Sequence, residues 1–95
     1  MTFFALKEFG SVLTGREYGK MVYGNLAPKI KPPVGLDFEG VEVMGSSFGD
    51  EIIIPIARDQ GNKISVKNAN PVIISCIMDI SEENRISVEV LTAPT

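Results

Sequence analysis

The central third of the chain constrains its fold more than any other feature. Residues 34–59 read VGLDFEGVEVMGSSFGDEIIIPIARD. VGLDF is a short apolar run typical of a buried strand, with Asp37 at or near its C-terminal end. We expect VEVM to continue the extended chain after a turn at Glu39-Gly40. The first half of this segment therefore predicts a strand and a second extended piece that ends near Gly45.

The residues after Gly45 carry conflicting signals, and we interpret them as a helix from Ser46 or Ser47 to about Asp59. The β-branched IIIPI run and its proline favour a strand or a kink. A helix is favoured because apolar residues recur four apart. These residues are Phe48, Ile52 and Ile56. We expect two carboxylates in the first turn, where they suit the positive end of the helix dipole. These are Asp50 and Glu51.

A second helix is expected over residues 15 to about 26. Thr14 and Glu17 have the spacing of a capping box, in which each side chain bonds the backbone of the other residue. The expected buried stripe consists of Tyr18, Met21, Val22 and Leu26. Residues 1–9 contain three aromatic side chains and are interpreted as a first strand.

A third helix is expected from Asn70-Pro71 to about Ile80, because Asn is a good cap and Pro suits the first helical position. Its expected apolar face consists of Val72, Ile73, Cys76, Ile77 and Ile80. The flanking segments KISVKN and RISVEVLT are interpreted as strands, with Ile64 and Val66 on one face of the first.

The order β-α-β-α-β-α-β predicts an α/β fold: a small sandwich with a mixed or parallel sheet, backed by about three helices. With 95 residues, we expect one domain over residues 1–95. Its predicted core includes Leu36, Phe38, Val41, Phe48, Ile52, Ile64, Val66 and Ile77.

Charge and composition exclude several classes of function. Residues 32–57 carry five carboxylates and no basic side chain, which disfavours binding to nucleic acid. The chain has no histidine, which removes the common catalytic triads and the usual metal ligand. We therefore expect no catalysis, no metal and no cofactor. The single cysteine, Cys76, is expected to be a buried apolar residue, and the lack of a signal peptide or membrane span predicts a cytoplasmic protein that does not associate with a membrane.

Three segments together resemble a known family: LTGREYGKMV, LDFEGVEVMGSSFGDEI and VKNANPVIISCI. The chain is similar to the STAS-like family of unknown function, which is related to the STAS-domain anti-sigma-factor antagonists. In those antagonists an extended segment leads to Asp-Ser-Ser-Gly and a helix, and the first serine accepts a phosphate. The resemblance places that serine at Ser46, with Ser47 beside it. Gly45 and Phe48 stand where the antagonists have aspartate and glycine.

The resemblance implies a non-catalytic regulator that binds a protein partner, such as a histidine-kinase-like ATPase or an anti-sigma factor. Ser46 and Ser47 are the candidate phosphate acceptors. The candidate interaction residues around them are Asp37, Gly45, Asp50 and Glu51. Three alternatives remain open: a plain helix cap at the serines, a self-assembling module or homodimer that uses Phe3, Phe4 or an exposed SVEV strand edge, and a site for a small anion or nucleotide at the Ser46 turn.

Overall fold

The computed structural model describes residues 1–91, which form a parallel four-stranded sheet, a smaller parallel pair of strands and three α-helices. The main sheet has the order β1-β3-β5-β6. Its strands are β1 (Thr2–Ala5), β3 (Val34–Asp37), β5 (Lys63–Lys67) and β6 (Ser87–Leu91). The smaller pair is β2 (Val12–Leu13) with β4 (Val43–Met44). The helices are α1 (Arg16–Leu26), α2 (Ser46–Arg58) and α3 (Pro71–Asn84), with 3-10 turns at Leu6–Phe9 and Ala27–Lys29.

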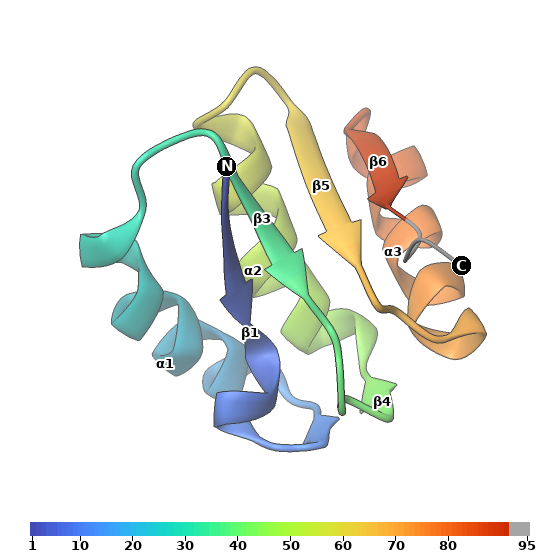
Figure 1. Cartoon of the computed structure of the whole chain (residues 1–95). Coiled ribbons are helices and arrows are strands. Elements are labelled where there is room, and N and C mark those ends of the chain that lie inside the picture. Colours follow the sequence, from blue (N-terminus) through green and yellow to red (C-terminus); the bar gives the residue numbers. More distant parts are fainter. Residues whose placement is uncertain (92–95) are drawn as a thin grey trace.

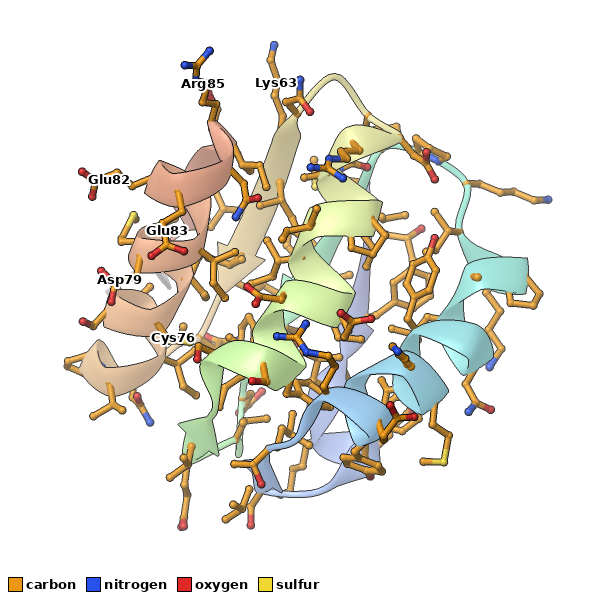
Figure 2. The ribbon with its side chains drawn as sticks, turned by 180° about the vertical axis from the view of Figure 1, so that it is seen from behind. Lys63, Cys76, Asp79, Glu82, Glu83 and Arg85 are labelled. Carbon is orange, nitrogen blue, oxygen red and sulfur yellow. The ribbon has the colours of Figure 1, made fainter. Side chains whose placement is uncertain are left out.

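All three α-helices cover the same face of the sheet (Figure 1). The strand order follows the chain order, so each crossover moves one position in the same direction along the sheet. Parallel crossovers are right-handed, and a series of them in one direction places every helix on one side. Seen from behind, the helices lie in front of the strands (Figure 2). The predicted α/β class is confirmed, and the sheet is parallel and backed by helices on one face.

The core lies between the sheet and the helices, and every residue predicted to be in it is buried. Phe48 of α2 is fully buried and packs its ring 5.7 Å from that of Tyr18 on α1. The two helices approach closely at Gly19, where an added Cβ would lie 2.9 Å from the Cβ of Glu51. A glycine is therefore needed at this crossing, because a larger residue would push the helices apart.

The expected helix from Ser46 to about Asp59 is confirmed, since α2 continues through Pro55 to Arg58. The turn that follows α2 has positive φ angles at Gly61 and Asn62. Asn70 caps α3 as predicted by accepting a hydrogen bond from the Ile73 N–H at 2.9 Å. That helix extends to Asn84, beyond the expected end near Ile80.

Three expectations about the helices were wrong. The capping box at Thr14 does not form, because Gly15, with φ 93°, occupies the cap position and no side chain bonds the first turn. Met21 is 52% exposed, because the contact with α2 lies on the face of α1 that carries Gly19 and Val22. Val72 is 62% exposed in the first turn of α3, because the buried face of this helix carries Ile73, Ile77 and Ile80 instead.

We predict that Phe48→Ala lowers the free energy of unfolding by about 3–5 kcal/mol, because it leaves a cavity between α1, α2 and the sheet. Urea denaturation monitored by circular dichroism measures the change. Met21→Ala is the matched control on the exposed face of α1, and it should change stability by less than about 0.5 kcal/mol. Equal effects of the two substitutions would contradict the packing described here.

Candidate functional site

The serine turn, defined here as Gly45, Ser46 and Ser47, is held by the small β2–β4 pair. The Gly45 N–H donates to the Leu13 carbonyl at 2.8 Å, which continues the parallel pairing up to the first residue of α2. The Gly49 N–H then bonds the Gly45 carbonyl at 2.9 Å and closes the first helical turn. The turn is thus fixed on both sides by backbone hydrogen bonds, which makes it a rigid platform.

The two serines occupy the first two positions of α2, and neither of them caps it. Gly45 is the cap residue, and no side chain bonds the first-turn amides. Ser46 is exposed and Ser47 is half-buried. The alternative in which the serines act only as a helix cap is therefore wrong. The Ser46 hydroxyl lies on the surface at the positive end of a helix of 13 residues.

Asp50 and Glu51 lie in the second turn of α2, not in the first as expected. Both are paired with Arg16, the first residue of α1. The guanidinium lies 2.8 Å from the Glu51 carboxylate and 3.4 Å from that of Asp50. The hydrogen bonds that the guanidinium donates to these carboxylates, first to Glu51 and then to Asp50, raise the pKa of Arg16. The negative charge expected beside the serine turn is therefore offset by a cation from the neighbouring helix.

Asp37 lies at the carboxyl end of β3 and forms hydrogen bonds with residues away from the serine turn. Its Oδ1 accepts hydrogen bonds from Asn68 Nδ2 at 2.9 Å and from the Glu39 N–H at 3.0 Å. Burial acts to raise the pKa of Asp37, but these two bonds and the charge of Lys67 outweigh it, and the pKa is lowered. Within residues 1–91 no hydrogen bond or ion pair links Asp37 to the serine turn.

Sequence reasoning missed an apolar strip beside the serine turn, which we call the valine strip: Val12, Val43 and Val72. Val12 and Val43 are direct partners in the β2–β4 pair and are 55% and 41% exposed. The start of α3, which carries Val72, is bound to the residue before β4, because Asn70 Nδ2 donates to the Glu42 carbonyl at 2.9 Å. The strip depends on the pairing of β2 with β4, and each of these strands has only two residues. Strands this short leave no periodic pattern in the sequence, so the strip could not be predicted from it.

Metal-binding groups, a reactive thiol, a surface groove and a membrane-spanning helix are the other features that could give the described residues a function. No group of three or more acidic or cysteine side chains in this part of the chain is placed to hold a metal ion. Cys76, which was expected to be buried, is only half-buried on α3 (Figure 2). Its partial burial, followed by the charges of Asp79 and Asp50, raises the pKa of its thiol. An open groove of about 480 Å³ runs between α1 and α2 and belongs to the surroundings of the Arg16 pair. None of the helices in residues 1–91 has the length and hydropathy needed to span a bilayer.

Comparison with known protein families gives a match over most of the helical layer. The family model described as a STAS-like domain of unknown function (DUF4325) matches residues 18–73, which is more than half of the chain. The matched region runs from α1 to the first turn of α3 and contains the serine turn. No curated protein and no solved structure matches the chain significantly.

We predict that the Asp37 carboxylate titrates below its ordinary value of 3.8. Because the folded pKa is depressed, its contribution to stability is present above the unfolded pKa and is lost as the pH falls through the folded value. Asn68→Gly should raise the midpoint, since it removes the donor, and glycine accepts the φ of 60° found there. Carboxyl-carbon NMR titration measures both variants. A wild-type midpoint at or above 3.8, unchanged in Asn68→Gly, would contradict the assigned hydrogen bonds.

Proposed function

Because the chain belongs to the STAS-like domain family of unknown function, we propose that it is a non-catalytic, cytoplasmic protein-interaction regulator that consists of a single STAS-like domain. Its partner contacts the serine turn and the valine strip. The absence of histidine from the sequence supports a binding role over acid–base catalysis.

The observation that carries this proposal is the position of an exposed serine next to exposed apolar side chains on a rigid frame. Val12, Val43 and Ser46 all lie on or next to the β2–β4 pair, and the hydrogen bonds of Gly45 fix their relative positions. Apolar side chains grouped at one end of a small protein are typical of an interaction site. A polar group at the edge of such a site controls binding, because a charge placed there must be desolvated when the partner docks.

Phosphorylation of Ser46 by an ATP-binding kinase partner is the form of control we propose, by resemblance to the anti-sigma-factor antagonists. The exposed hydroxyl is accessible, and the positive end of α2 would stabilise an attached phosphate. Asp50 lies one turn below Ser46 and would repel the phosphate, but Arg16 already offsets its charge. The kinase would be a histidine-kinase-like ATPase, and the regulated partner would be that ATPase or an anti-sigma factor.

We predict that Ser46→Asp weakens binding to a cytoplasmic partner at least tenfold, whereas Ser46→Ala keeps it. Neither variant should change the melting temperature much, because the Ser46 side chain caps nothing. An Asp at this position gains about 0.3–1 kcal/mol from the helix dipole and loses about 0.2–0.5 kcal/mol to Asp50 four residues away. Pull-downs from the native host, with melting curves for each variant, measure the two effects separately.

Two further variants make the test specific. Val43→Thr keeps the shape of the side chain but makes the strip polar, and it should also weaken the partner. Asn25→Asp adds the same charge as Ser46→Asp at the exposed far end of α1, and it should leave binding unchanged. Recovery of the same partner in equal amounts with Ser46→Asp, Ser46→Ala and Val43→Thr would rule out the serine turn as the binding surface.

A further inference from the structure

No helix or strand of residues 1–91 packs against the face of the main sheet opposite the helices, although Ser65 at its centre is only 7% exposed. Parallel sheets are nearly always covered on both faces, so an open face is unusual. Residues of successive strands lie side by side on it in two rows. The first row is Phe3, Gly35, Ser65 and Glu89, and the second is Ala5, Asp37, Lys67 and Leu91. We call these eight residues the open face. It faces the viewer in Figure 1.

Interactions between its side chains confirm that the open face is one surface. Lys67 Nζ lies 4.4 Å from the centre of the Phe3 ring, and Ser65 Oγ lies 3.3 Å from a carboxylate oxygen of Glu89. Phe3 lies against Gly35, where an added Cβ would be 2.5 Å from the ring. Gly35 therefore lets the aromatic ring approach the backbone of β3 closely.

The charged residues of the second row indicate which partner would complement this surface. Asp37 and Lys67 are direct neighbours on the two central strands, β3 and β5. If a second copy packs face to face about a two-fold axis parallel to the strands, β3 lies over β5 of the other copy. Each Asp37 then lies opposite a Lys67, and the two-fold makes this pair twice. A two-fold axis across the strands would instead bring Lys63, which lies on the same side of β5, over Lys67 and is disfavoured by repulsion.

We infer that the open face is a self-association surface whose occupant is a second copy of this chain, held by two reciprocal Asp37–Lys67 pairs. The pairs lie near the two-fold axis, and Ala5 faces Leu91 at the edge. This surface is separate from the serine turn, so the inference stands independently of the proposed function. The face measures on the order of 300 Å² from the strand spacings, well below the roughly 800 Å² per partner of a stable dimer. We therefore expect weak association, with a Kd on the order of 100 μM.

Two charge-reversed variants of the full chain test this geometry. Lys67→Asp makes both central positions acidic, and Asp37→Lys makes both basic. Each variant alone should be monomeric where the wild type dimerises, because like charges face each other across the axis. An equimolar mixture should form a heterodimer, since every acidic position of one variant then meets a basic position of the other. The repulsion within each copy is unchanged by mixing, so recovery reports the contact between copies alone.

Sedimentation equilibrium between about 10 μM and 1 mM measures the wild type, each variant and the mixture. We expect the mixture to associate at least about tenfold more tightly than either variant alone. Lys20→Asp on the outer surface of α1 carries the same charge change as Lys67→Asp and should leave wild-type association intact.

Circular dichroism shows whether each variant is folded. Asp37→Asn retains an acceptor for Asn68 and the Glu39 N–H, and it should weaken association even if Asp37→Lys fails to fold. A wild type that is monomeric at 1 mM overturns the inference. A dimer that Lys67→Asp and Asp37→Asn leave unchanged also overturns it, because such a dimer uses another surface.

Discussion

The order of the strands in the main sheet determines which surfaces of the molecule are covered and which are exposed. The strands of the main sheet follow one another in space in the same order as in the chain. Every right-handed crossover therefore places its helix on the same face of the sheet. One face of the sheet therefore forms the entire core, and the other remains open (Figure 1). Because no reversal of strand order occurs, the sheet lacks the crevice where doubly wound folds bind small ligands. The surfaces that this topology leaves available are the open face of the sheet and the outer side of the helices, which includes the groove between α1 and α2.

Local chemistry in the sequence predicted the three α-helices and the four strands of the main sheet, but not β2, the 3-10 turn over Leu6–Phe9 or the contacts between distant segments. The Asn70-Pro71 start of α3 and the spacing of Phe48 on α2 identified helices, because both signals act within a few residues. The β2–β4 pair joins segments about thirty residues apart through two residues each, and no periodicity reports such a contact. The exposure of Met21 also depends on a contact between distant segments. The close approach of α1 to α2 at Gly19 determines which face of α1 is buried, and Met21 is not on that face.

The candidate site shows the same division. The resemblance to the STAS-like family located the serine turn, and the structure places Ser46 on the surface at the start of α2. The acidic residues near it in sequence have separate roles: Asp50 is paired with Arg16, and Asp37 is bound to Asn68. The negative charge at the serine turn is therefore smaller than the sequence positions of these residues suggested. The apolar contribution to the site comes instead from the valine strip, which only the tertiary structure brings together.

The proposed contact of a protein partner with the serine turn and the valine strip can be tested residue by residue. The measurement is an amide NMR spectrum of the isotope-labelled chain in an extract of its native host. We expect selective loss of signal at residues 43–48 and at the start of α3, while amides at the far end of α1 remain sharp. A spectrum identical to that in buffer, or changes confined to amides elsewhere, would contradict a partner-binding role for this surface.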